Sequence, residues 1–223
     1  MARGHNKMSN VSNVRNFSAL RQFIRERGPV EHCELCSADL AVEHPHLIEP
    51  IGRKLLCACD PCSILFSGQS GTKYRRVPRR IVALADFRIT DAQWEALMIP
   101  INMAFLFFSE PQQKIVALYP SPAGATESLL PLDSWDDIVS DNPILKNMEP
   151  DVEALLVSRV DRMHGRSSAE YYLAPIDECY KLVGLIRANW RGFSGGSEVW
   201  DQIAQFFETL KRRANVVSGA ARA

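Results

Sequence analysis

Clustered cysteines are the strongest constraint that this sequence places on its own fold. All but one of its six cysteines lie in a single short segment near the N-terminus. Cys33 and Cys36 form a C-x2-C pair, and Cys59 and Cys62 form a second pair with the same spacing. Two such pairs are the pattern of a four-thiolate metal site, because a C-x2-C turn lets both of its sulfurs reach one ion.

The segment between the two pairs is predicted to form a β-hairpin over residues 47–56. A hairpin returns the chain to its starting point and thereby brings the second pair of thiols beside the first. We therefore expect a small zinc-ribbon-like module. In it, one Zn²⁺ ion is bound by Cys33, Cys36, Cys59 and Cys62.

The segment holds more potential ligands than a four-coordinate site needs. Cys57 can replace Cys59, because a C-x4-C pair with Cys62 also reaches one ion. His44 and His46 are possible additional or alternative ligands, although positions beside the site or on the surface are favoured for the histidines. The same four sulfurs suit iron, or a labile site that accepts a metal and hands it on. Zinc is the favoured ion and iron is the alternative.

The composition is that of an ordinary globular protein without net charge. Hydrophobic residues make up 46% of the chain and charged residues 23%, and the 26 basic side chains balance the 26 acidic ones. The protein therefore has no long-range electrostatic field from a net charge that would attract nucleic acid or an anionic membrane. The N-terminus lacks an apolar signal core, and the most apolar run, residues 99–108, is shorter than the roughly 20 residues that span a bilayer. We expect a cytoplasmic protein without a membrane span, where clustered cysteines more often bind metals than form disulfides.

The rest of the chain predicts an α+β domain. Strands are predicted over residues 79–85, 101–108, 114–119, 152–160 and 169–173. Helices are predicted to begin near Thr90, Asp133, Pro175 and Ser197. No regular crossover helices separate the strands, so a mixed, mainly antiparallel sheet with packed helices is favoured over a doubly wound fold.

The expected organisation follows from these elements. It comprises a disordered N-terminus over residues 1–15, a helix plus the cysteine-rich metal module over 16–66, the α+β domain over 67–214 and a disordered tail over 215–223. Within the domain, Met98 and Trp200 are predicted to face inward from their helices, and Ser197 to cap the last helix. Residues 120–124 are predicted to be a loop, and Cys179 a buried core thiol.

The sequence contains no recognisable catalytic pattern. An H-E-x-x-H helix, a paired-carboxylate motif and a Ser/His/Asp set are all lacking, which makes an enzyme the less favoured class, although catalytic groups can converge only in three dimensions. A basic run follows the module and contains Arg75, Arg76, Arg79 and Arg80. This run is the best support for nucleic-acid binding by a zinc ribbon. The lack of net charge favours a solvated edge or a protein-docking surface instead.

Several short segments of the sequence resemble those of an uncharacterised bacterial family, a domain of unknown function. They are CELC at residues 33–36, HPHL at 44–47, LCACDPC at 56–62, YPSPAGATES at 119–128, DVEALLV at 151–157, PIDECY at 175–180 and WRGF at 190–193. The resemblance extends over about residues 16–213. Members of that family are encoded beside actinobacterial-type, oxygen-tolerant uptake nickel–iron hydrogenases. The resemblance carries no established activity, and it implies a role in assembling, maturing or supplying metal to a hydrogenase.

These observations favour a metal-binding accessory protein that acts through protein–protein contacts, with a hydrogenase subunit or maturation factor as its partner. An iron-binding redox protein that transfers single electrons is the first alternative. A zinc-ribbon nucleic-acid-binding protein is the second.

Overall fold

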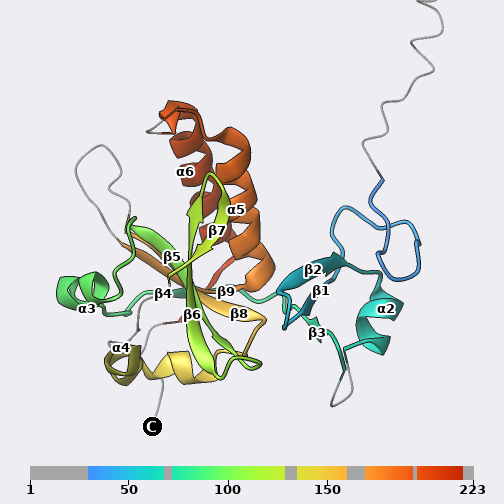
Figure 1. Cartoon of the computed structure of the whole chain (residues 1–223), viewed down its shortest axis with the longest axis horizontal. Coiled ribbons are helices and arrows are strands. Elements are labelled where there is room, and N and C mark those ends of the chain that lie inside the picture. The colour runs from blue at the N-terminus through green and yellow to red at the C-terminus, as the bar shows by residue number, and fades with distance from the viewer. Residues whose placement is uncertain (1–29, 68–71, 129–134, 160–168, 193–194, 218–223) are drawn as a thin grey trace, which may run out of the picture.

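The computed structural model describes residues 30–67, 72–128, 135–159, 169–192 and 195–217. Within them, a small module with the clustered cysteines lies beside a larger α+β domain (Figure 1). The expected disordered N-terminus, the expected helix before the module and the expected cap Asp133 lie outside the described residues.

The module is built on a β-hairpin. Strands β1 (His46–Glu49) and β2 (Lys54–Cys57) pair antiparallel, which confirms the predicted hairpin. Strand β3 (Arg75–Arg76) pairs with the other edge of β1 and completes a three-stranded sheet. A short helix, α2 (Asp60–Leu65), follows β2 and was not predicted. A proline in its first turn suits this start, because a helix has no hydrogen-bond acceptor for the N–H groups there.

The domain is centred on a seven-stranded sheet with the order β10-β4-β9-β8-β5-β6-β7. The strands are β4 (Val82–Leu84), β5 (Met103–Ser109), β6 (Lys114–Ser121), β7 (Gly124–Glu127), β8 (Glu153–Ser158), β9 (Glu170–Pro175) and β10 (Asn215–Val217). Every neighbouring pair is antiparallel except β10 and β4, which are parallel. The mixed, mainly antiparallel sheet of an α+β fold is thus confirmed.

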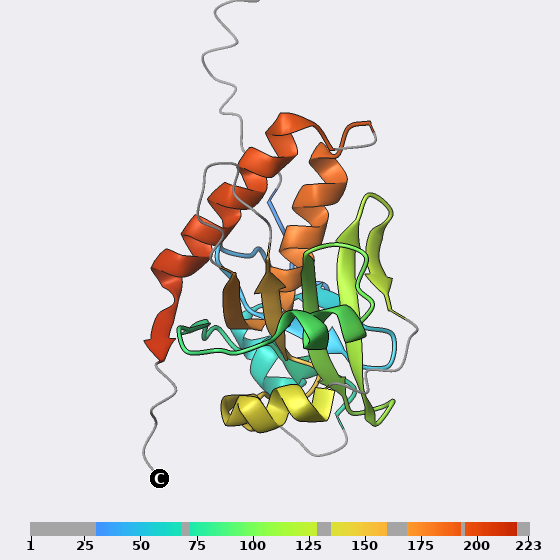
Figure 2. The ribbon, with the colours of Figure 1, turned by 90° about the vertical axis from the view of Figure 1, so that its left-hand side faces the viewer.

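Helices cover both faces of this sheet (Figure 2). They are α5 (Ile176–Asn189) and α6 (Gly196–Arg213) on one face, and α3 (Asp91–Ala96), α4 (Trp135–Asp141) and the 3-10 helix η1 (Pro143–Asn147) on the other. Side chains alternate along a strand, so β5 serves both layers. Phe105 and Phe107 join the core beneath α5 and α6, while Ala104 and Leu106 join the core beneath α3 and α4. Among the described helices, none is long and apolar enough to cross a membrane.

Two side chains that were predicted to face inward are exposed. Met98 is 64% exposed and has a φ of 51°, because α3 has already ended at Ala96 and the chain turns away from the helical path. Trp200 is 41% exposed and packs edge-to-face against Trp190 on the rim of α6. Cys179, in contrast, is fully buried on α5, as predicted.

Three segments fold differently from the prediction. Gly195 precedes α6 with a φ of 86°, so Ser197 lies inside the helix instead of capping it. Residues 120–124 are part of the β6–β7 hairpin, whose turn places Gly124 at a φ of 124° that other residues rarely adopt. Residues 215–217, expected in a disordered tail, form β10 beside β4.

The module and the domain share an interface. Arg53 in the hairpin donates a 2.8 Å hydrogen bond to Glu127 on β7, and Arg75 on β3 bonds to the buried Asp151 at 3.0 Å. Ile48 on β1 is buried in the same core as α5 and α6. The hairpin is therefore fixed to the domain by apolar burial and by ion pairs.

Candidate metal centre

Four cysteine sulfurs gather at one end of the module. The sulfur atoms of Cys33, Cys36, Cys59 and Cys62 all lie within 4.8 Å of one another, and those of Cys36 and Cys59 are 3.6 Å apart. Zinc–thiolate bonds of about 2.3 Å in a tetrahedral site separate the sulfurs by about 3.8 Å. The spacing of this four-sulfur group therefore suits one tetrahedral ion.

The first pair of sulfurs is positioned by a tight turn. The N–H of Cys33 donates to the carbonyl of Ala38, and the N–H of Ser37 donates to the carbonyl of Cys33, both at 2.8 Å. Ser37 has a φ of 62°, which reverses the chain directly after Cys36. This turn brings both thiols of the pair to the same side of the backbone.

The second pair is positioned by the start of a helix. Cys59 is the residue that precedes α2, and Cys62 lies in its first turn. The carbonyl of Cys59 accepts a 2.8 Å hydrogen bond from the N–H of Ser63, so the helical geometry begins at the first ligand of the pair. The rigid first turn of α2 fixes the distance between the two sulfurs.

The two buried thiols of the group, those of Cys33 and Cys62, differ in how readily they ionise. Burial raises the pKa of the Cys33 thiol, but donation from the backbone N–H groups of Cys59 and Leu35 lowers that pKa to about 6. Burial and the neighbouring thiols raise the pKa of Cys62. Four thiolates at this spacing repel one another, and a bound cation offsets that repulsion.

The thiols also make up much of the module's own core. Its buried cluster consists of Cys33, Leu47, Ala58 and Cys62, with four further side chains partly buried around it. Two of the four buried members belong to the four-sulfur group. So little apolar surface gives the module a weak core of its own, which is the usual circumstance of a structural metal site.

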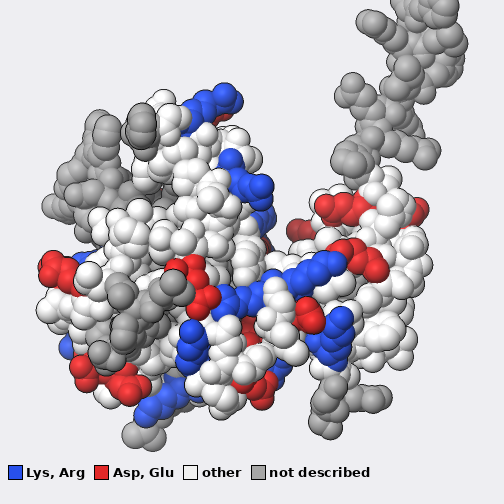
Figure 3. All heavy atoms as spheres, in the orientation of Figure 1, with Lys and Arg blue, Asp and Glu red and all other residues white. Residues whose placement is uncertain are grey.

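The basic run after the module is largely paired with carboxylates. Arg75 lies 2.8 Å from Glu110, in addition to its bond with Asp151. Arg80 donates to Glu153 at 2.7 Å, and this hydrogen bond raises the pKa of the guanidinium. Figure 3 shows basic and acidic side chains interspersed over the face drawn. These carboxylates offset the positive charge on which the nucleic-acid hypothesis depends.

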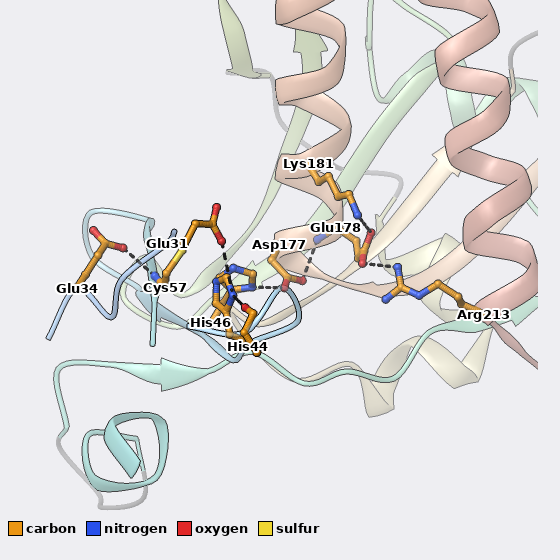
Figure 4. Close-up of polar contacts among 10 residues, drawn as sticks. Glu31, Glu34, His44, His46, Cys57, Asp177, Glu178, Lys181 and Arg213 are labelled. Atoms are coloured by element: carbon orange, nitrogen blue, oxygen red, sulfur yellow. Dashed lines mark hydrogen bonds and ion pairs between the residues drawn. The ribbon is translucent and has the colours of Figure 1, made fainter. Parts of the chain in front are cut away.

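The structure places the three surplus ligands in a second group. His44, His46 and Cys57 offer ligand atoms that lie within 4.8 Å of one another. Leu47 belongs to the core around the four-sulfur group, so His46, its neighbour along β1, faces the other side of the hairpin. Cys57 is the cross-strand partner of His46 and shares that side. Figure 4 shows the two imidazoles between Cys57 and Asp177 at the start of α5.

The family model of DUF5947, a family of unknown function, matches residues 32–214. The chain belongs to this family. The matched range includes both groups of ligands, and the membership agrees with the resemblance to a domain of unknown function. No curated protein and no solved structure matches the chain. The association with hydrogenases stays a prediction.

Sequence reasoning missed one residue of this region of the DUF5947 chain. Asp177 accepts a hydrogen bond from Nδ1 of His46 at 2.8 Å, although 131 positions separate the two residues. No local pattern marks this aspartate, which sits in the acidic first turn of α5 like many helix-start carboxylates. Only the docking of the module on the domain brings it to the histidine.

Proposed function

We propose that this protein is a cytoplasmic, zinc-binding accessory protein that acts through protein–protein contacts on a nickel–iron hydrogenase subunit or maturation factor. The gathering of Cys33, Cys36, Cys59 and Cys62 within 4.8 Å is the observation that carries the metal-binding part. Four protein ligands occupy all four coordination positions of a tetrahedral ion and leave none for a substrate. The role of this zinc is therefore structural.

An exposed apolar surface supports the protein-contact part of the proposal. Ile64, Leu65 and Phe66 are consecutive at the end of α2 and are 61%, 68% and 43% exposed. Contiguous apolar side chains on a surface commonly mark a binding site for another protein. Cys59 and Cys62 frame the start of the same helix, so a zinc ion at these thiols holds this surface in its shape. The choice of a hydrogenase as the partner is based on the sequence resemblance.

Elemental analysis of the purified full chain tests the identity of the metal. We expect at least one zinc per chain and a colourless protein, with one zinc fewer per chain in a Cys33→Ser variant. Iron together with visible absorption contradicts the zinc assignment and favours the redox alternative.

Affinity purification from native cells tests the partner. We expect a tagged full-length chain to retain a hydrogenase subunit or maturation factor, and Ile64→Asp to abolish that retention. Ile51→Asp is the matched control, because Ile51 is 81% exposed in the turn of the β1–β2 hairpin, away from α2. Retention that survives Ile64→Asp overturns the proposed surface. Failure of the unmodified chain to retain any hydrogenase component overturns the proposed partner.

A salt titration tests the nucleic-acid alternative. We expect no binding of DNA or RNA even at low salt, because carboxylates pair with Arg75 and Arg80. Binding that weakens steeply with rising salt concentration contradicts this expectation.

A further inference from the structure

We propose a second metal site, separate from the four-sulfur group, in which His44, His46 and Cys57 bind one exchangeable divalent transition-metal ion of the zinc type. This histidine–cysteine site goes beyond the structural zinc proposed above. Two imidazoles and one thiolate form a donor set of intermediate softness, which suits Zn²⁺ and its neighbours in the first transition row. One ligand atom from each of the three residues lies within 4.8 Å of the others.

Hydrogen bonds to the two histidines leave the same nitrogen of each ring free. Nδ1 of His46 lies 2.8 Å from a carboxylate oxygen of Asp177, and Nδ1 of His44 lies 2.9 Å from the carbonyl oxygen of Ala41. Both partners are acceptors, so each Nδ1 carries the proton and donates it. Each Nε2 then presents a lone pair, which is the arrangement of metal-binding histidines whose other nitrogen is held by a carboxylate or a backbone carbonyl.

The free nitrogen of His44 is an unpartnered polar atom in a buried position. The side chain of His44 is only 6% exposed, and no hydrogen-bond partner for its Nε2 exists within the described residues. Burying an acceptor without a partner costs stability. A metal ion between this nitrogen, His46 and Cys57 would give the buried atom its missing partner.

The hairpin holds the three ligands in place before any ion binds. His46 and Cys57 are directly opposite each other on β1 and β2. The N–H of Ala58 donates to the carbonyl of Pro45 at 3.0 Å, which extends the pairing beyond the strand ends and fixes the approach of His44. The rings of His44 and His46 meet edge-to-face with their centres 4.9 Å apart. A preorganised donor set of this kind loses little conformational entropy when it binds metal.

A cleft gives this site an open side. The cleft has a volume of about 330 Å³ and is lined by His46, Cys57, Tyr180 and Lys181, among others. Three protein ligands leave one position of a tetrahedral ion for water or a small anion that enters the cleft. The four-sulfur group offers no such position, so exchange of metal belongs to the histidine–cysteine site.

A cysteine nucleophile with a histidine base is the competing interpretation of the same residues. Cys57, His46 and Asp177 lie in the order of a nucleophile, a base and a group that orients the base. A nucleophile–base pair, however, gives no partner to the buried nitrogen of His44.

Metal stoichiometry tests the proposal directly. The reduced full-length protein is dialysed to equilibrium against Zn²⁺, and the bound zinc is counted. We expect two ions per chain for the unmodified protein and one for His44→Ala or Cys57→Ser. His32→Ala and Cys179→Ala are matched controls, since they remove an imidazole and a thiol outside both groups, and both should keep two ions.

Titration with Co²⁺ supplies a measurement that needs no variant. We expect two successive spectra, one with intense thiolate-to-cobalt absorption from the four-sulfur group and one with much weaker absorption from the single thiolate of Cys57. If only the intense spectrum appears, with one ion per chain, the second site is overturned and the proposed structural zinc site stands. If only the weak spectrum appears, the proposed four-sulfur zinc site is overturned and the second site stands.

Alkylation separates the metal site from the nucleophile. We expect Zn²⁺ to protect Cys57 from iodoacetamide, as measured by mass spectrometry of its peptide. Rapid alkylation of Cys57 that Zn²⁺ does not slow overturns the proposal and favours the cysteine–histidine pair.

Discussion

The module and the domain of this chain both contain antiparallel hairpins, yet they differ in what holds the hairpins together. In the domain, β5 inserts Phe105 and Phe107 into a core shared with two long helices. In the module, the buried cluster contains Leu47 and Ala58 and otherwise consists of thiols. A sheet that is covered by helices is stabilised by apolar burial, whereas a hairpin with so small a core depends on cross-linking by a metal.

Removal of zinc should produce the largest difference between the two regions. Structural zinc sites contribute on the order of 10 kcal/mol or more to folding, so chelation or Cys59→Ser should unfold most of the module. We expect amides of residues 33–62 to lose protection in hydrogen exchange while those of β5 and β8 keep theirs. Equal loss of protection in both regions would show that the domain also depends on the metal.

Truncation of the domain core should have the opposite selectivity. Phe105 is fully buried, so Phe105→Ala should lower the free energy of unfolding of the domain by about 3–5 kcal/mol. Zinc stoichiometry should not change. The control Val216→Ala removes a side chain that is 72% exposed and should change stability by less than about 0.5 kcal/mol. Chemical denaturation followed by tryptophan fluorescence measures both variants, and zinc loss in Phe105→Ala would contradict the separation.

The segment that connects the two regions should show an intermediate effect. Glu153 has a side chain that is 1% exposed, and Arg80 is its ion-pair partner. Arg80→Ala leaves this carboxylate buried without a cation and should lower the free energy of unfolding by about 2–3 kcal/mol. The loss is smaller than for a fully buried pair, because Arg80 is half exposed. Arg79 makes no ion pair with any described residue, so Arg79→Ala should cost less than about 0.5 kcal/mol. Equal stability of the two variants in urea would show that water solvates Glu153 in place of Arg80.

The same comparison explains how much could be predicted from the sequence. The two C-x2-C pairs and the hairpin between them are local patterns, and their spacing alone brings the four thiols together. The five inner strands of the domain's sheet were also predictable, because strands such as β5 and β8 are apolar runs in the sequence. The edge strands β7 and β10 were not predicted, since they are short and lack such a run. Met98 and Trp200 were misplaced, because periodicity assumes a helix that extends to the residue and a neighbour that covers it.

The arrangement of the second group of ligands was beyond such local patterns. The alternation of β1 separates His46 and Cys57 from the four-sulfur group, and that separation requires the register of the hairpin to be known. The bond between His46 and Asp177 depends on the docking of two regions that are far apart in the chain. Sequence spacing identifies ligands that are close in the chain, but a carboxylate that orients one of them from another domain leaves no periodic signal.

The smallest predicted effect tests that orienting bond. Asp177→Ala should leave His46 in place but free to change its ring orientation and tautomer, and it should weaken metal binding at the histidine–cysteine site by about 10-fold or more. Zinc in the four-sulfur group should be unaffected, because Asp177 bonds to His46, which lies on the opposite face of the hairpin from that group. Glu178→Gln is the control, since Glu178 pairs with Arg213 instead of a histidine. Competition titrations with a metal chelator measure both affinities. Equal weakening of both sites by Asp177→Ala would mean that the aspartate holds the module on the domain as a whole, and that the two faces of the hairpin are not energetically separate.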